Sequence, residues 1–152
     1  MTLDVTALAH GMTESVPLVR TLGITFASVS ADGTEVVADL PDRPDLHNHV
    51  GGPHAGVMFS LAETASGGVV LSAFAEQLAD AVPLAVGARI AYRKLAMGDV
   101  RATARLARPI ADVVAELAAG ARPEFDVDVQ ITRADGAVTA EMTVTWTLRP
   151  NR

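Results

Sequence analysis

The 152 residues are 49% hydrophobic and 20% charged, with a formal net charge of −6 and no cysteine. This length and composition predict one domain (residues 1–152) with a substantial core, and they argue against wholesale disorder. The missing cysteines exclude disulfides, a thiol nucleophile and zinc–thiolate sites, and the negative charge argues against nucleic-acid binding. The first ten residues lack the basic segment of a secretory signal, so we expect a cytoplasmic protein.

Helical spacing of apolar residues predicts an N-terminal helical segment (residues 1–22) in two pieces, divided at Pro17 and closed by Gly23. The next two stretches, 24–30 and 34–40, flank an Asp-Gly pair and predict a β-hairpin. Pro41 ends the second strand. A loop rich in His, Gly and Pro then leads to the longest apolar segment of the chain.

This apolar segment starts near His54 or Ala55 and continues to Ala75. It contains no proline and is apolar almost all round, which predicts a helix that is buried inside the fold. Its uncharged part, residues 64–75, is too short and too rich in Gly and Ser to cross a membrane. We therefore expect a core helix and no membrane contact.

Glu63 lies in the middle of the predicted core helix, and no Lys or Arg occurs between positions 43 and 89. Burial of an unpaired carboxylate costs several kcal/mol, or raises its pKa until the group is neutral. A helix that keeps such a group indicates a functional carboxylate. The alternative is that Glu63 faces solvent from a narrow strip of Gly and Ser residues on the same helix.

Four further strands are predicted after the helix, joined by hairpins, in the stretches 84–95, 100–108, 125–133 and 137–149. Residues 109–120 predict a short helical insertion between two of these strands. We expect the strand with Arg89 and Arg93 to pair with the strand that carries Arg101 and Arg105. The sum is an α+β fold, with one antiparallel sheet wrapped around a long central helix.

Residues 48–56 read NHVGGPHAG, and residues 61–63 read LAE. In this motif and in the order of its elements, the sequence resembles the hotdog-fold acyl-CoA thioesterases of the PaaI-like and DUF4442-like branch. The similarity in layout extends from about residue 18 to residue 148. The resemblance implies a hotdog fold, hydrolysis of an acyl-CoA thioester, no cofactor other than the coenzyme A of the substrate, and a homodimer or homotetramer.

The resemblance also implies roles for individual residues. Glu63 would be the general base or nucleophile at the thioester carbonyl, and the backbone N–H of Ala55, next to Gly56, would polarise the thioester oxygen. Asn48 would hold the attacking water or the carbonyl, and His54 would orient the loop or contact the substrate. In these enzymes the cleft lies between the base of one subunit and the loop of the other.

The sequence departs from the family pattern at one place. Some members carry Ser or Thr early in the strand after the helix, near the reacting centre, whereas residues 85–87 here are Ala, Val and Gly. One group that could position water is therefore missing, which bears on the rate or on the substrate.

Arg89, Arg93 and Lys94 form a cationic cluster at the end of one predicted strand. Most such charges cover a solvated sheet face, but in a protein of net negative charge they could bind the phosphates of coenzyme A. The acyl group is expected beside the core helix, against residues such as Val57, Met58 and Leu61.

Other functions compete with thioester hydrolysis. A non-catalytic acyl-CoA-binding hotdog dimer would use Glu63 only to line a polar pocket. A hotdog dehydratase or hydratase would pair His49 with Glu63, although the Phe-Pro-Gly and Met-Pro-Gly signatures of those enzymes are absent. A metal site at His47, His49 and His54 is a weaker hypothesis, because zinc needs three well-spaced and well-oriented ligands, and we expect none.

Overall fold

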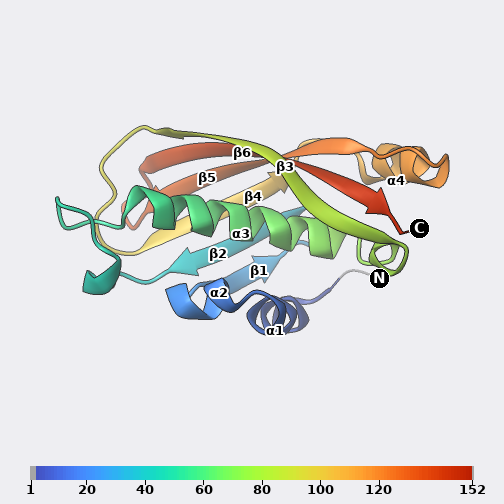
Figure 1. The fold of residues 1–152 in the computed structure, drawn as a ribbon. Coiled ribbons are helices and arrows are strands. Elements are labelled where there is room, and N and C mark those ends of the chain that lie inside the picture. The colour runs from blue at the N-terminus through green and yellow to red at the C-terminus, as the bar shows by residue number, and fades with distance from the viewer. Residues whose placement is uncertain (1–2, 152) are drawn as a thin grey trace.

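A curved antiparallel sheet holds one long helix against its concave face in the computed structural model, which describes residues 3–151 (Figure 1). Within these residues the six strands are β1 (Thr25–Val29), β2 (Glu35–Leu40), β3 (Ala81–Tyr92), β4 (Val100–Leu106), β5 (Glu124–Arg133) and β6 (Val138–Pro150). The helices are α1 (Val5–Ser15), α2 (Pro17–Leu22), α3 (Ala55–Ala73) and α4 (Ile110–Ala118), with short 3-10 turns at Pro44–Leu46 and Gln77–Ala79.

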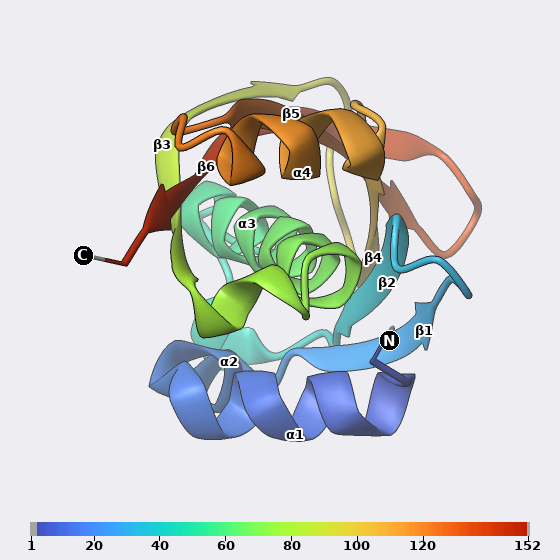
Figure 2. The ribbon, with the colours of Figure 1, turned by 90° about the vertical axis from the view of Figure 1, so that its right-hand side faces the viewer.

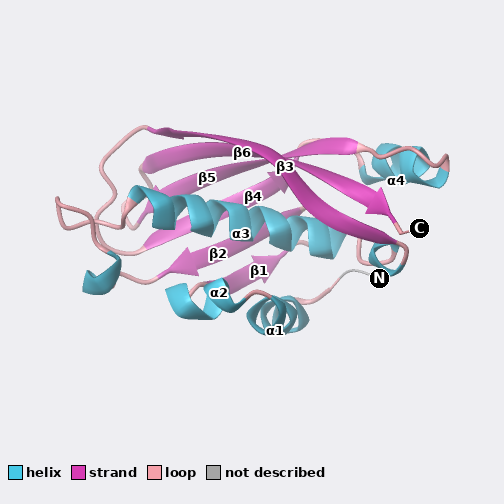
Figure 3. Ribbon diagram, viewed as in Figure 1, coloured by secondary structure: helices cyan, strands magenta, loops and turns pink. Residues whose placement is uncertain are grey.

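The order of helices and strands confirms the α+β architecture predicted from the sequence (Figure 3). The expected alternation of buried and exposed residues is clearest in β5, where every second side chain from Phe125 to Ile131 is buried. Alternation of this kind puts one face of a strand against the core and the other in water. The buried faces of β2, β4, β5 and β6 contact α3.

The strand order is β1-β2-β4-β5-β6-β3, so the predicted hairpin between β3 and β4, and with it the predicted pairing of their arginines, is wrong. β3 instead pairs along its length with β6, from Ala81 opposite Pro150 to Tyr92 opposite Ala140, and the chain then crosses the sheet to begin β4. Alternating polarity specifies which face of a strand is buried, but it does not specify the neighbouring strand. β3 therefore lies at one edge of the sheet, with no strand on its other side among the described residues.

Helix α3 is enclosed by the sheet on one side and by α1 on the other (Figure 2). Close packing is possible because Gly68 has no side chain: a Cβ there would lie 3.1 Å from Val36 Cγ1 and 3.3 Å from Phe26 Cε1. At the far end of α3, the rings of Phe74 and Phe125 lie 4.9 Å apart. By length and composition α3 could span a membrane, but most of it is buried inside the protein, as in other core helices.

Helix α1 is anchored by its first turn and by its inner face. The Asp4 side chain caps the helix by accepting a hydrogen bond of 2.8 Å from the backbone N–H of Ala7. Leu8 and Met12 are buried against the core. The C-terminal end of α1 thereby comes to lie beside the middle of α3, where Glu63 is located.

Candidate active site

The loop before α3 is organised by the side chain of Asn48. Its Oδ1 accepts hydrogen bonds from the backbone N–H groups of Val50 (3.0 Å) and Gly52 (3.2 Å). Gly51 adopts a φ of 81°, which favours glycine, and a Cβ at Gly52 would come 2.1 Å from the carbonyl oxygen of Ala96. The oxygen of Asn48 is thus used within the loop, and its amide Nδ2 is the part that remains free to donate to a ligand. Asn in a Gly-rich loop is a turn signal that could have predicted this role.

His54 caps the N-terminus of α3. Its Nδ1 accepts a 2.9 Å hydrogen bond from the backbone N–H of Gly56, so this ring nitrogen carries no proton. The N–H of Ala55 has no acceptor among residues 3–151 and lies at the exposed end of the helix. Of the two amides singled out from the sequence, Ala55 is therefore the one that can bind a substrate oxygen, with the helix dipole favouring negative charge there.

A hollow of about 380 Å³ lies beside this helix N-terminus. Asn48 and Ala55 line it together with Arg93 and Lys94, which follow the end of β3. Tyr92 also lines it and donates a 2.9 Å hydrogen bond from its hydroxyl to the carbonyl oxygen of Ala55, and burial raises the pKa of Tyr92 and keeps this donor protonated. The loop, the helix end and two cations predicted separately from the sequence thus meet in one place.

Glu63 lies eight residues further along α3 and is half-buried. Among the described residues its carboxylate has no hydrogen-bond or ion-pair partner. Removal from water raises the pKa of Glu63 above the ordinary value of a glutamate. The alternative of a fully solvated Glu63 does not fit this environment, although the carboxylate is reachable from a cavity.

This cavity of about 230 Å³ is mostly apolar. Besides Glu63, it is lined by Met12, Ser15, Val16, Thr64, Gly67, Val70, Leu71, Pro83 and Trp146. The residues that we expected from the sequence to line an acyl pocket lie elsewhere: Leu61 is fully buried in the core and Met58 lines the hollow at the helix N-terminus. Contributions from α1, β3 and β6 were missed because no local pattern shows which distant segments pack beside Glu63.

Within one chain, the N-terminus of α3 and the carboxylate of Glu63 lie far apart. Ala55 and Glu63 are separated by eight residues of α3, or about 12 Å along the helix axis at 1.5 Å per residue. They line different cavities, and His49, which is exposed in the loop, does not line the cavity at Glu63. A thioester group held at Ala55 therefore cannot reach Glu63 of the same chain.

The cationic cluster is divided between two surfaces. Arg89 and Arg93 line a groove of about 530 Å³ on the outer face of the sheet, and Arg93 with Lys94 lines the hollow at the helix N-terminus. Arg93 forms an ion pair with Glu141 at 3.1 Å, in which both side chains are about half exposed. Exposed pairs of this kind contribute little stability and can exchange for another anion. The two arginines of β4 instead pair with carboxylates of the neighbouring strand β2, Arg101 with Asp39 and Arg105 with Glu35.

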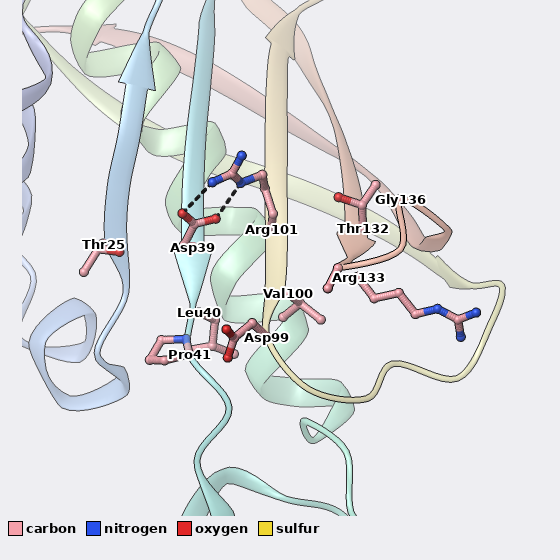
Figure 4. A pocket seen from close by; sticks show the side chains of 11 residues that line it. Thr25, Asp39, Leu40, Pro41, Asp99, Val100, Arg101, Thr132, Arg133 and Gly136 are labelled. Carbon is pink, nitrogen blue, oxygen red and sulfur yellow. Dashed lines mark hydrogen bonds and ion pairs between the residues drawn. The ribbon is translucent and has the colours of Figure 1, made fainter.

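Another hollow, of about 610 Å³, lies on the outer face of β2 and β4, with α3 behind the strands (Figure 4). Its charged groups are already engaged. Arg101 makes a two-pronged contact of 2.7 and 2.9 Å with Asp39, and Arg133 pairs with Asp135 at 2.9 Å. Asp99 Oδ1 accepts a 2.7 Å hydrogen bond from the backbone N–H of Asp42. Among the described residues, this hollow therefore offers no unpaired charged side chain that would indicate a catalytic role.

The histidines of the loop have separate contacts. His47 Nε2 lies 2.6 Å from Asp42 Oδ1, His54 caps α3, and His49 is exposed. Within residues 3–151 no three His, Asp or Glu side chains are grouped in a way that could hold a metal ion.

The fold is that of the hotdog proteins of the thioesterase superfamily. The chain belongs to the family described as "Domain of unknown function (DUF4442)", whose model matches residues 6–148. No curated protein matches the sequence.

Two solved structures illustrate the similarity. One is a protein of unknown function from Pseudomonas aeruginosa, described as a probable thioesterase, with 28% identity, coverage of 99% of both chains and a TM-score of 0.86. The other is the PaaI protein of the phenylacetic acid degradation operon of Escherichia coli, with 19% identity, coverage of 97% of this chain and 94% of that one, and a TM-score of 0.74.

The raised pKa of Glu63 predicts how its replacement affects stability. Because the folded protein binds this proton more tightly than the unfolded chain, the ionised carboxylate destabilises the fold once the pH exceeds the ordinary pKa of glutamate, and increasingly so up to the raised pKa. Glu63→Gln should therefore increase the free energy of unfolding at neutral pH, and the gain should vanish as the pH falls below the ordinary glutamate range. Urea denaturation across this pH range measures it.

Glu124→Gln, at an exposed position of β5, is the matched control and should change stability little at any pH. A Glu63→Gln variant that is less stable than the wild type at neutral pH would contradict the assignment of Glu63 as a desolvated, unpaired carboxylate.

Proposed function

We propose that this protein hydrolyses acyl-CoA thioesters to the free acid and coenzyme A. The observation that carries the proposal is Glu63, an unpaired carboxylate with a raised pKa beside an apolar cavity. A carboxylate in this state is a stronger base than a solvated one and can act near neutral pH. The apolar cavity next to it suits an acyl group, which must lie beside the base for the carbonyl to react.

In the proposed reaction Glu63 takes a proton from a water molecule, and the oxygen of this water attacks the thioester carbonyl carbon. The carbonyl oxygen becomes an oxyanion, which the N–H of Ala55 stabilises at the positive end of α3. When the tetrahedral intermediate collapses, the C–S bond breaks and the Glu63 carboxyl returns its proton to the leaving thiolate. The products are a carboxylic acid and free coenzyme A.

We place this reaction at the interface of a homodimer. The separation of Ala55 from Glu63 along α3 supports this, since a site needs Glu63 of one protomer and Ala55 of the other. The free edge of β3 supports it as well: residues 85–89 are exposed, and Val86 retains 45% of its accessible surface. Long open edges of this kind readily pair with another strand, and two antiparallel copies would bring the loop of each to the base of the other.

The hollow at the helix N-terminus is the proposed contact for coenzyme A. Lys94 lies there without an ion-pair partner among the described residues, beside Arg93, whose pair with Glu141 is exposed. Phosphate groups bind well to such exposed cations at a helix N-terminus. Arg89 lines the outer groove and would favour phosphate binding only through the positive electrostatic potential that it shares with Arg93 and Lys94.

The non-catalytic acyl-CoA binder is the second candidate. It is favoured by residues 85–87, which supply no hydroxyl group to position water. The cavity and the cations would serve binding alone equally well, so the distinction depends on whether Glu63 carries out chemistry.

A thiol-release assay tests the proposal. Acetyl-, octanoyl-, palmitoyl-, phenylacetyl- and benzoyl-CoA should include at least one substrate, and Glu63→Gln should reduce its kcat by about a hundredfold or more, the size typical of a positioned base. Glu124→Gln should retain wild-type activity. Absence of hydrolysis by the wild type, with acyl-CoA still bound, would favour the binder.

The oxyanion donor can be removed without disturbing the helix. Ala55 is the first residue of α3, and His54 before it has φ −58° and ψ 142°, a conformation that a following proline accepts. Ala55→Pro, which lacks the N–H, should lower kcat by about a hundredfold. Ala55→Gly keeps the N–H and should lose little. Equal activity of the two variants would exclude Ala55 as the donor.

The same variants test the shared site. Refolded mixtures of Ala55→Pro and Glu63→Gln should recover about a quarter of wild-type activity, because half of the random dimers are mixed and each mixed dimer holds one intact site. Recovery absent from a mixture shown to exchange subunits would contradict a site built from two protomers.

A further inference from the structure

A hollow of about 490 Å³ lies at the end of the sheet where β6 finishes beside the start of β3 (Figure 1). The residues that line it are Arg122, Arg149, Pro150 and Asn151. None of them lines a hollow described above. The backbone N–H of Asn151 donates a 2.8 Å hydrogen bond to the carbonyl oxygen of Asp80, which ties the residue after β6 to the turn before β3. The two arginines therefore supply the charge of this hollow.

Both arginines lack a carboxylate partner among residues 3–151. Six other arginines in this part of the chain each form an ion pair, as Arg108 does with Glu116. Carboxylates are plentiful, and even Glu124, two residues after Arg122, does not pair with it. Like charges that share a hollow without a counter-ion repel each other, and a bound anion would relieve this repulsion.

The guanidinium group of Arg122 is held by a buried hydroxyl. Its Nε donates a 3.3 Å hydrogen bond to Thr147 Oγ1, which itself donates at 2.8 Å to the carbonyl oxygen of Pro123. The bond at Nε fixes the plane of the group, and Nη1 and Nη2 have no acceptor among the described residues. Thr147 and Arg149 are two residues apart on β6 and so lie on the same face of the sheet. Both arginines are thus directed to one face, and one of them is already oriented.

We infer that Arg122 and Arg149 form a binding site for a phosphate group. A phosphate carries up to two negative charges on three or more oxygens, and a guanidinium group binds such oxygens through paired hydrogen bonds. A carboxylate has one charge and two oxygens, which suits a single arginine. The two unpaired arginines therefore match a phosphate better than a carboxylate. This site is separate from the cavity at Glu63, and it does not depend on the proposed hydrolysis.

The phosphate can come from coenzyme A or from a separate phosphate compound. In the proposed dimer, edges centred on residues 85–89 place Val82 of one protomer opposite Tyr92 of the other, because both lie five positions from the midpoint. Arg149 is opposite Val82 in β6, about 10 Å or two strand spacings from that Tyr92. Lys94 follows two residues later. Coenzyme A with its diphosphate at Lys94 of one protomer could therefore place its ribose 3′-phosphate at Arg149 of the other.

Titration with inorganic phosphate tests the site, followed by carbon-detected NMR of the arginine guanidinium groups. Phosphate should shift the signals of Arg122 and Arg149 with a Kd in roughly the millimolar range, the strength expected of two charge-assisted hydrogen bonds. Arg20, an exposed arginine of α2 without an ion pair among the described residues, is the matched control and should not respond. Shifts that sodium chloride of equal ionic strength reproduces, or that Arg20 shares, would overturn the site.

The double variant Arg122→Gln, Arg149→Gln identifies the source of the phosphate. It leaves no buried donor unpaired, because the hydroxyl of Thr147 keeps its bond to Pro123. Calorimetric titration of the wild type should show coenzyme A binding about tenfold or more tightly than dephospho-coenzyme A, which lacks the 3′-phosphate. The double variant should lose this difference, and Arg20→Gln should retain it.

The outcomes separate this inference from the proposed function, because none of these measurements depends on hydrolysis. Equal or absent binding of the two coenzymes, with phosphate still shifting Arg122 and Arg149, would assign the site to a separate phosphate compound. A tenfold difference that persists in the double variant would exclude these arginines as the contact of the 3′-phosphate. No shift with phosphate, together with no difference between the coenzymes, would overturn the inference.

Discussion

The burial of α3 and the charge that it carries constrain the whole molecule. A helix that is apolar nearly all round must be covered, and the sheet and α1 together cover it. Glu63 is the exception in this helix, since it has neither a counter-ion nor a hydrogen-bond donor among the described residues. The same burial that stabilises the fold therefore raises the pKa of Glu63 and makes its carboxylate a stronger base.

Helix α3 sets the distance between its N-terminus, where Ala55 lies, and the carboxylate of Glu63. The N-terminus of the helix is fixed by the His54 cap and by the loop folded around Asn48, which packs against Ala96 so closely that only glycine fits at position 52. Two turns later, the helix presents Glu63 to the cavity. A rigid helix keeps these groups about 12 Å apart, and for this reason the proposed site takes Ala55 and Glu63 from two different protomers.

The features that the sequence predicted depend on residues close together in the chain. The start of α3 at Ala55 follows from the His-Gly-Pro loop and the apolar run after it. The burial that raises the pKa of Glu63 follows from the apolar character of the helix around it. The α+β architecture follows from the alternation of the strands. These features depend on periodicity and turn residues, which are legible in a single sequence.

What the sequence could not predict depends on contacts between distant segments. The predicted pairing of β3 with β4 was wrong, because Gly98 and Asp99 resemble a hairpin turn although the chain crosses the sheet there and β3 pairs with β6. Trp146 comes to face Gly67 only through the packing of β6 against α3. Chain topology is set by the packing of the whole core, so the wall of a cavity made from four elements has no local signature.

The central claim is that a desolvated Glu63 acts as the base, and the pH dependence of kcat/KM for the best thioester tests it most directly. We expect the rate to rise with pH through a single ionisation whose pKa lies above the ordinary value of a glutamate. The acid limb should disappear in the residual activity of Glu63→Gln. An acid limb at the ordinary glutamate value, or one that persists unchanged in Glu63→Gln, would contradict the account.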